Sequence, residues 1–269
     1  MRGAGPPMQF VPSTVMTLAL AEQMEKEEGI IQPRKGKKDP DVGPDLIAVM
    51  TPEELSYLLG HYNKGEIRSH DYGFFNLHQL PGKVNTRLSL SGPFVGAPQA
   101  VMGIEKMIAL GARRVWALGW CGSLQAGLTI GDFLVPTGAI SEEGTSKHYP
   151  ISNRPIKPDA GLSGLLEKFL KNKGHTVKKG LVWSTDAPYR ETPSKVKEYQ
   201  RKQVMAVEME MSALMTLAIY RSVKLAALLV VSDELFDLNW RRGFSDPKFK
   251  KRSHLAADLL LGLVPSLGA

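Results

Sequence analysis

From Asp45 onward, the pattern of apolar and polar positions predicts buried strands that alternate with amphipathic helices. Short apolar runs such as 225–231 are typical of strands covered on both faces. The stretch 98–110 instead spaces its apolar residues three and four positions apart, which predicts a helix that Gly111 ends. The other predicted helices are 162–170, 210–220 and 255–263, and the predicted strands are 46–50, 84–90, 115–119, 131–140, 177–183, 204–207 and 225–231. This alternation predicts one α/β domain with a mostly parallel or mixed sheet between two helical layers.

The sequence Thr51-Pro52-Glu53-Glu54 predicts the start of a further helix. Thr51 suits the N-cap, and Pro52 suits the first helical position because its fixed backbone already matches a helix. Glu54 stands three residues after Thr51, where its side chain can close a capping box. We therefore expect both side chains to bond the backbone of the first turn.

Residues 1–44 differ in composition from the rest of the chain. They contain several prolines and glycines and the basic run 34–38, with one short helix expected over about 14–27. We interpret 1–44 as an N-terminal extension that is partly mobile, and 45–269 as the folded domain.

The formal net charge of +7 allows two interpretations. An excess of cations can attract anionic ligands or nucleic acid. The excess lies in segments that read as exposed, such as 171–179 and 248–252, and none of them interleaves aromatic with basic residues as single-strand binders do. We favour a solvated lysine-rich surface and expect no nucleic-acid partner.

The single cysteine, Cys121, rules out a disulfide within the chain and fits a reducing compartment. The apolar stretch near the N-terminus is short and is followed at once by glutamates, unlike a signal peptide. No stretch reaches the ~18 apolar residues of a membrane span. We therefore expect a soluble, cytoplasmic protein without a membrane partner.

Five predicted strands are followed by small or acidic polar residues, namely Ser91-Gly92, 119–123, 184–186, 208–210 and 232–234. One such strand end is ordinary, because Ser, Thr and Asp start helices. Ligands of α/β sheets bind at the carboxyl ends of strands. We therefore interpret the five ends together as a concave site lined by hydroxyls and carboxylates.

This chemistry suits a sugar attached to a base. A carboxylate such as Glu210 or Glu208 can accept hydrogen bonds from two adjacent ribose hydroxyls, and Asp233 can share a proton with a leaving base. The alternative is that Asp233 caps a loop or pairs with Arg241 or Arg242. No His, Cys or carboxylate cluster has metal-ligand spacing, so we expect no metal and no cofactor.

Three stretches in this order resemble the nucleoside phosphorylase superfamily, which includes uridine phosphorylase, hexameric purine nucleoside phosphorylase and methylthioadenosine nucleosidase. They are 109–125 with the following Ile130-Gly131-Asp132 and 142–149, then 207–211, then 231–234. The similarity covers roughly residues 45–264. It implies a single-domain three-layer α/β/α sandwich with a central mixed β-sheet, and a homo-oligomer that is a dimer or a trimer of dimers.

The resemblance also implies roles for individual residues. Glu210 would bind the ribose hydroxyls, with Met209 packed on the sugar and Glu208 beside them. Asp233 matches the acid that protonates the base in purine-acting relatives and that uridine phosphorylases lack. The base-binding residues would be Thr185, Asp186, Tyr189 and Ser232, although Pro188 stands where a stacking aromatic is usual. Cys121 is interpreted as a packed small residue, and His148 is the one histidine expected near the site.

The chain departs from these relatives where they bind phosphate. Their Gly-Asp-Pro-x-Arg loop corresponds to Met50-Thr-Pro-Glu-Glu54, and two further arginines correspond to Ala117 and Asp71. The expected phosphate or water site comprises Ser91, Gly92, Gly119 and Trp120, where Trp120 would fill the phosphate volume if water is the nucleophile. Arginines elsewhere that could hold phosphate instead are Arg68, Arg87, Arg190 and Arg241.

Three functions therefore remain open at the level of the sequence. Phosphorolysis of a nucleoside to base and ribose 1-phosphate, with inorganic phosphate as co-substrate, follows from the resemblance and would serve purine or uridine salvage. Hydrolysis by a nucleosidase follows from the missing arginines. A non-catalytic nucleoside- or nucleotide-binding protein is the third. Asp233 favours a purine as the base.

Overall fold

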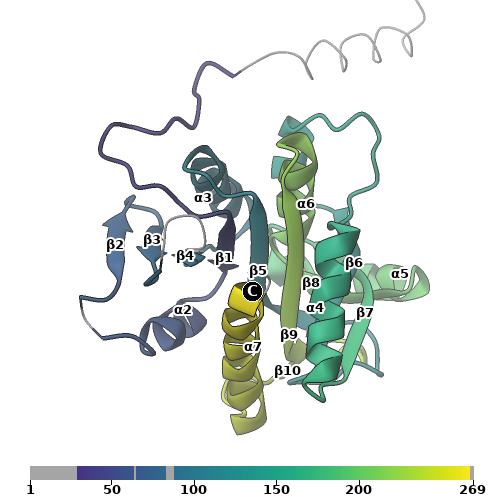
Figure 1. Ribbon diagram of the computed structural model, residues 1–269. Coiled ribbons are helices and arrows are strands. Elements are labelled where there is room, and N and C mark those ends of the chain that lie inside the picture. Colours follow the sequence, from purple (N-terminus) through teal and green to yellow (C-terminus); the bar gives the residue numbers. More distant parts are fainter. Residues whose placement is uncertain (1–28, 64, 83–87, 267–269) are drawn as a thin grey trace, which may run out of the picture.

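The computed structural model describes residues 29–63, 65–82 and 88–266. In these residues the strands form one ten-stranded sheet in the order β10-β9-β6-β7-β8-β5-β1-β4-β3-β2 (Figure 1). Parallel and antiparallel pairs both occur, so the sheet is mixed as predicted. The strands are β1 (Asp45–Val49), β2 (Arg68–Asp71), β3 (Asn76–Gln79), β4 (Leu88–Gly92), β5 (Arg114–Ser123), β6 (Phe133–Ser141), β7 (Val177–Ser184), β8 (Val204–Glu208), β9 (Lys224–Glu234) and β10 (Arg241–Arg242).

Five of these strands close into a ring. β5 pairs along its length with β9, and the path β9-β6-β7-β8 returns to the last residues of β5. The pairing of β5 with β8 involves Gly122 and Ser123, and β9 meets the same residues through Asp233 and Glu234. The carboxyl ends of β5, β8 and β9 are therefore neighbours.

Helices cover both faces of the sheet. They are α2 (Pro52–Leu59), α3 (Ala97–Ala109), α4 (Ala160–Asn172), α5 (Pro193–Arg201), α6 (Met211–Tyr220) and α7 (Pro247–Ser266). The buried residues of α3 and α6 pack on one face, while those of α2, α4 and α7 pack on the other (Figure 1). Within β1, Leu46 and Ala48 join the first of these cores and Ile47 and Val49 join the second, as the alternation of a strand requires. The predicted three-layer sandwich is confirmed.

Several predicted element boundaries are wrong. The polar residues 119–123 and 232–234 belong to β5 and β9 instead of following them, because the ladder between these two strands continues to Ser123 and Glu234. The strand predicted at 84–90 is observed at Leu88–Gly92, and 83–87 lie outside the described residues. The polar hairpin of β2 and β3 and the helix α5 were not expected, since they carry few apolar residues at a regular spacing.

The capping box predicted at the start of α2 does not form. Thr51 is the N-cap residue, but its side chain makes no hydrogen bond to the helix backbone. Its hydroxyl donates to the carboxylate of Glu54 instead. Glu54 is buried against α7, where Ser253 also donates to it, so tertiary contacts have replaced the local motif.

The described part of the N-terminal extension runs along the C-terminal end of α3. Lys106 of α3 donates to the carbonyl of Arg34 (2.7 Å) and to Asp39 (2.6 Å), and the buried Val42 donates its N–H to the carbonyl of Leu110 (2.9 Å). The helix expected at 14–27 lies outside the described residues.

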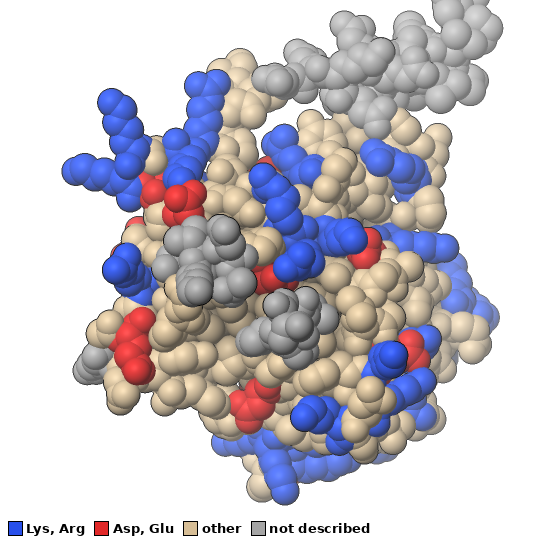
Figure 2. All heavy atoms as spheres, viewed as in Figure 1, with Lys and Arg blue, Asp and Glu red and all other residues tan. Residues whose placement is uncertain are grey.

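The charged side chains are distributed over the surface of the view in Figure 2. Lysines and arginines lie over several elements, with acidic residues between some of them, and they do not gather in one patch on that face. None of the helices in the described part of the chain has both the length and the apolar character of a membrane span.

Candidate functional site

A cavity of about 360 Å³ lies where β5, β8 and β9 end. The turn 188–191 and the segment that follows β9 complete its wall. Its lining comprises Trp120, Cys121, Gly122, Pro188, Tyr189, Glu191, Val207, Glu208, Met209, Ser232, Asp233, Leu235, Trp240 and Phe244. The ring of strands therefore brings together three of the five strand ends that the sequence marked as polar.

Asp233, near the end of β9, points its carboxylate into this cavity. Oδ1 accepts a hydrogen bond from the Ser232 hydroxyl (2.7 Å), and Oδ2 accepts one from the indole nitrogen of Trp240 (2.8 Å). Burial raises the pKa of Asp233 against the opposite influence of these two donors. Arg241 does not pair with Asp233, because it bonds Glu234 and Asp237. Asp233 is therefore a partly dehydrated acid held by two neutral donors.

Glu191 is a second acid in the same cavity, and sequence reasoning missed it. It follows the single helical turn Pro188–Arg190 and is half-buried. Burial and the nearby Asp233 raise its pKa from 4.5 to about 7. In the sequence, the only signal for Glu191 was its position shortly after the polar strand end 184–186, because no motif marks it.

Glu208 also lines the cavity, but its carboxylate is fully engaged. It accepts hydrogen bonds from the Ser184 hydroxyl and from the backbone N–H groups of Glu210 (2.6 Å) and Met211 (2.7 Å). These are orphan donors at the start of α6, where a negative charge is favourable. Burial raises the pKa of Glu208, and its donors act in the opposite direction. Glu208 thus fixes the turn from β8 into α6.

Glu210 is the residue just before α6 and lies outside the cavity lining. It is 7% exposed, and its Oε1 accepts a hydrogen bond from the backbone N–H of Gly96 (2.6 Å) in the loop before α3. Burial, followed by the charge of Glu208, raises its pKa to about 8. Met209 between the two glutamates does line the cavity.

The residues expected to bind a base lie in two different places. Tyr189 and Ser232 line the cavity, and Tyr189 is 93% exposed. Thr185 is buried and its hydroxyl oxygen accepts from the N–H of Ala187 (3.2 Å). Asp186 points the other way and accepts from the N–H of Gly144 (2.8 Å). The 184–189 segment therefore turns one side toward the cavity and the other toward a second hollow.

The residues expected at a phosphate or water site are also dispersed. Of the four, Trp120 lines the cavity. The buried Ser91 donates to the carbonyl of Asn76 (2.9 Å), and Gly92 lies so close to β1 that an added Cβ would stand 2.2 Å from the carbonyl oxygen of Val49. Gly119 faces the side chain of Met50. β1 separates β4 from β5 in the sheet, which explains the distance of Ser91 and Gly92 from the cavity.

A buried carboxyl group stands where the resemblance leads us to expect the arginine of a phosphate-binding loop. Glu54 is 2% exposed and accepts hydrogen bonds from Thr51 and Ser253. Ser253 in turn accepts from the indole nitrogen of Trp120 (3.1 Å). Glu54, Ser253 and Trp120 thus form a hydrogen-bonded chain from the core to the wall of the cavity, without a cation.

No lysine or arginine is among the described residues that line the cavity. Of the arginines considered as replacements, Arg87 lies outside the described residues, and Arg241 is bound to two acids. Burial raises the pKa of the Cys121 thiol well above its ordinary value, so this lining residue is a neutral, packed thiol. No group of three His, Cys, Asp or Glu among the described residues could hold a metal ion.

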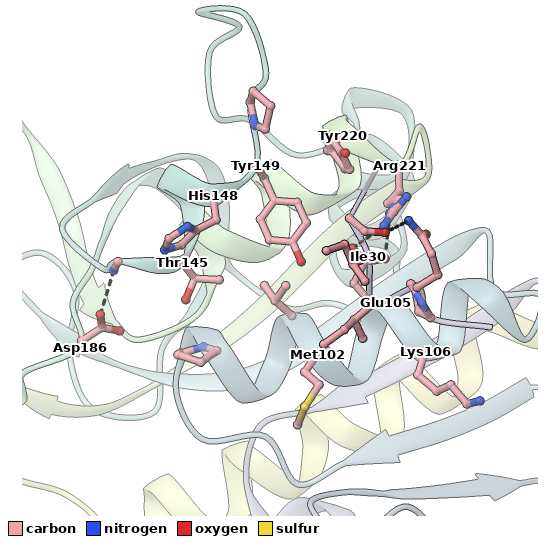
Figure 3. Close-up of a pocket in the computed structure, with 18 residues that line it drawn as sticks. Ile30, Met102, Glu105, Lys106, Thr145, His148, Tyr149, Asp186, Tyr220 and Arg221 are labelled. Carbon is pink, nitrogen blue, oxygen red and sulfur yellow. Dashed lines mark hydrogen bonds and ion pairs between the residues drawn. The ribbon is translucent and has the colours of Figure 1, made fainter. Parts of the chain in front are cut away.

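A second, larger hollow of about 1050 Å³ lies between α3, the 144–150 segment and residues 29–33 (Figure 3). Arg221 and Glu105 form a bidentate ion pair (2.8 and 2.9 Å) at one end of it, and Asp186 lies at its other end. His148 lines this hollow and not the cavity beside Asp233. The hollow contains two of the residues expected at or near the site, Asp186 and His148, whereas the smaller cavity contains six, Trp120, Tyr189, Glu208, Met209, Ser232 and Asp233. The smaller cavity is therefore the better candidate for a catalytic site.

Comparisons with known proteins bear on the family and on the fold. A family model described as "Phosphorylase superfamily" matches residues 45–264. A guanosine phosphorylase of Halorubrum lacusprofundi is 29% identical over 168 residues, which cover 62% of this chain and 70% of that protein. A DeoD-type purine nucleoside phosphorylase of Clostridium novyi is 26% identical over 208 residues, covering 74% and 86%.

Solved structures show the same fold. A purine nucleoside phosphorylase from Toxoplasma gondii in complex with immucillin-H superposes with a TM-score of 0.75 at 22% identity, covering 90% of this chain and 98% of that one. A uridine phosphorylase from Vibrio fischeri superposes with a TM-score of 0.73 at 22% identity, covering 86% and 95%.

Proposed function

The chain belongs to the phosphorylase superfamily, and we propose that it is an enzyme that cleaves the N-glycosidic bond of a purine nucleoside. The observation that carries this proposal is the cavity at the ends of β5, β8 and β9 with the acid Asp233 in its wall. At about 360 Å³ it falls within the ~300–1,000 Å³ typical of small-molecule sites.

Asp233 is the proposed general acid. A purine leaves the sugar more readily when a ring nitrogen accepts a proton, and a positioned carboxylic acid can give that proton. Because burial raises the pKa of Asp233, more of it is protonated at a given pH than of an ordinary aspartate. Ser232 and Trp240 hold the group in place through one hydrogen bond to each oxygen.

The proposed ribose site lies between Met209 and Glu210. The Glu210 carboxyl group would accept hydrogen bonds from the ribose hydroxyls while Gly96 fixes its orientation from the opposite loop. Glu208 would act by positioning, because its hydrogen bonds to the start of α6 hold the turn on which both residues stand. Carboxylates here would also stabilise the positive charge that develops on the ribosyl group.

Aromatic side chains make the cavity suitable for a flat base. Trp120, Tyr189, Trp240 and Phe244 all line it, and the rings of Trp120 and Phe244 are 5.9 Å apart. We propose that the base lies against these rings, with the exposed Tyr189 at the entrance.

Water is the nucleophile that the cavity favours. A phosphate dianion requires charge-assisted hydrogen bonds or cations when it leaves bulk water. The lining supplies no lysine or arginine, and the chain from Trp120 through Ser253 leads to the acidic Glu54. These features support a hydrolytic nucleosidase.

Phosphorolysis is the second candidate, and the relatives favour it. The similar proteins are named guanosine, purine nucleoside and uridine phosphorylases. In that case the cation for phosphate would have to come from outside the cavity lining, for example from a second subunit. We propose a homo-oligomer, at least a dimer, with a role in nucleoside salvage under either mechanism.

Base release from guanosine, inosine, adenosine and uridine, with and without inorganic phosphate, tests the proposal. Phosphate-independent release of a purine supports the nucleosidase. Release that requires phosphate and yields ribose 1-phosphate supports the phosphorylase. Binding of a nucleoside without release, or faster cleavage of uridine than of any purine nucleoside, would refute the proposal.

A further inference from the structure

The hollow between α3, the 144–150 segment and residues 29–33 has no role in the proposed reaction. Its volume is about 1050 Å³, and much of its lining between the two charged ends is apolar, including Pro98, Val101 and Met102 of α3. Met102 is 45% exposed. Apolar surface gathered in a hollow is typical of a site that another apolar group covers.

The N-terminal extension forms one wall of this hollow and leaves two of its own apolar side chains uncovered. Residues 29–33 line the hollow together with α3 (Figure 3). Ile30 and Ile31 among them are almost fully exposed, at 102% and 93%. Isoleucine is one of the residues most often buried in proteins, so two adjacent exposed isoleucines beside an apolar hollow indicate that a further group covers them.

The part of the extension next to this wall is held on α3 and on the hairpin of β2 and β3. Lys106 donates to the carbonyl of Arg34 and to Asp39, and the hydroxyl of Tyr72 donates to the same carboxylate (3.1 Å). The ion pair of Lys106 and Asp39 is largely buried. Because 34–39 are held in this way, residues 1–28 begin at the wall of the hollow.

The sequence of residues 1–28, which lie outside the described part of the chain, supplies a suitable occupant. Residues 10–21 contain eight apolar residues among twelve and no charged residue. Residues 22–28, which link them to Gly29, can span up to ~23 Å at ~3.3 Å per residue. The hollow measures about 10 Å, the cube root of its volume, so the apolar stretch can reach all of it.

We propose that residues 10–21 occupy the hollow of their own chain, with their apolar side chains against Val101, Met102 and the two isoleucines. A segment on such a short tether meets the hollow at an effective concentration on the order of millimolar, so modest apolar contacts hold it there. A separate protein would have to supply the whole free energy of association from its own contacts. The proposal does not depend on the reaction at the smaller cavity.

Disulfide trapping in the full-length chain tests the proposal. Met102→Cys is combined in turn with Met16→Cys and with Leu18→Cys, while the buried Cys121 is kept. We expect a disulfide within one chain, which removes two thiols and leaves the monomer mass unchanged in non-reducing electrophoresis. Leu165→Cys in place of Met102→Cys is the matched control, because Leu165 is equally exposed (44%) but lies on α4, on the opposite face of the sheet. The bond should form about 10-fold faster or more than in this control.

A charge placed in the apolar stretch provides a second measurement. Leu20→Glu, added to the cysteine pair, should slow formation of the bond about 10-fold, because a carboxylate is costly to remove from water. Gln23→Glu adds the same charge outside residues 10–21 and should leave the rate unchanged. Equal melting temperatures of the two variants show that the folded domain is intact in both.

A bond within one chain that forms faster than in the control and is slowed by Leu20→Glu supports the proposal. A product of dimer mass shows that a second copy fills the hollow, which overturns it. Bond formation no faster than with Leu165→Cys, or at the same rate in the Leu20→Glu and Gln23→Glu variants, overturns it as well.

Discussion

The indole nitrogen of Trp240 lies 2.8 Å from Oδ2 of Asp233 and donates a hydrogen bond to it. This bond stabilises the ionised form of the carboxyl group and lowers its pKa against the effect of burial. Trp240 is itself 55% exposed, with the guanidinium of Arg242 5.4 Å from the centre of its ring. The proposed acid is therefore tuned by a residue at the surface.

Replacing this donor is expected to shift the pH dependence of catalysis. In Trp240→Phe the pKa of Asp233 rises, so the acid stays protonated to higher pH. The pH at which kcat/KM falls on the alkaline side should rise by roughly 0.5–1 unit. This shift corresponds to about 1 kcal/mol for one hydrogen bond. A pH profile of guanosine cleavage measures it. An alkaline limb that does not move would exclude Asp233 as its origin.

Asp233→Asn is expected to lower kcat by about 10²-fold or more, because the amide gives up no acidic proton. Its oxygen can still accept from Trp240, and its NH2 can donate to the Ser232 hydroxyl, which rotates to accept. The melting temperature should change little. Steady-state kinetics on the best purine nucleoside check the first expectation, and thermal unfolding checks the second. Near-normal kcat in a folded variant would identify Asp233 as a structural residue.

Glu210→Ala is expected to abolish turnover, because the proposed ribose hydroxyls lose their acceptor. The Gly96 N–H also loses its partner, which should cost about 1 kcal/mol of stability. Glu210→Gln keeps the acceptor for Gly96 and serves as the control for folding. Binding of free base should survive in both variants. Retention of kcat/KM in Glu210→Ala would place the sugar elsewhere.

Glu191 makes the free energy of unfolding depend on pH. Its pKa is about 7 in the folded protein against 4.5 as the ordinary value, so the folded state holds this proton more tightly than the unfolded chain. That contribution to stability is complete below about pH 4.5 and is lost as the pH rises through 7.

Glu191→Gln removes this loss. The free energy of unfolding of the variant, relative to that of the wild type, should be roughly 1–3 kcal/mol higher at pH 8 than at pH 5. Urea unfolding at both values measures the difference, and Glu198→Gln should show no such gain because Glu198 is on the surface. An equal difference at the two pH values would mean that Glu191 does not titrate in this range.

Ser253→Ala is expected to destabilise the protein by roughly 1–3 kcal/mol. Ser253 donates to the buried Glu54 and accepts from Trp120, so its loss leaves both groups without that partner. Ser194→Ala at the exposed start of α5 is the control, with little change expected. Denaturant unfolding distinguishes the two. If Ser253→Ala is as stable as the control, the chain from Glu54 to Trp120 contributes nothing.

The sequence predicted the fold because apolar runs and amphipathic stretches alternate clearly after Asp45, and the strands bury both faces. It predicted the boundaries less well. Polar residues 119–123 and 232–234 read as loops, yet the ladder between β5 and β9 includes them. β2 is polar and largely exposed, and β3 is buried but contains one apolar residue, Leu77, so the hairpin carries little apolar signal.

Part of the candidate site was predictable from the sequence, because some of its residues directly follow apolar runs. Met209, Ser232 and Asp233 follow apolar runs, and their meeting depends on β5 pairing with both β8 and β9. Ser91 and Gly92 carry the same local signal, but β1 keeps them away from the cavity. Glu191 and Trp240 come from a turn and a loop whose paths are set by tertiary packing, which no local pattern encodes.

The ring of β5, β9, β6, β7 and β8 has a consequence for how the protein folds. Its longest ladder joins Arg114 with Lys224, which are far apart in the chain, so the ring closes through contacts of high sequence separation. Folding with such contact order is slow, because loop entropy is lost before the contacts form. During synthesis, β5 leaves the ribosome before β9 does. Until β9 follows, one edge of this apolar strand is unpaired and can aggregate with other chains.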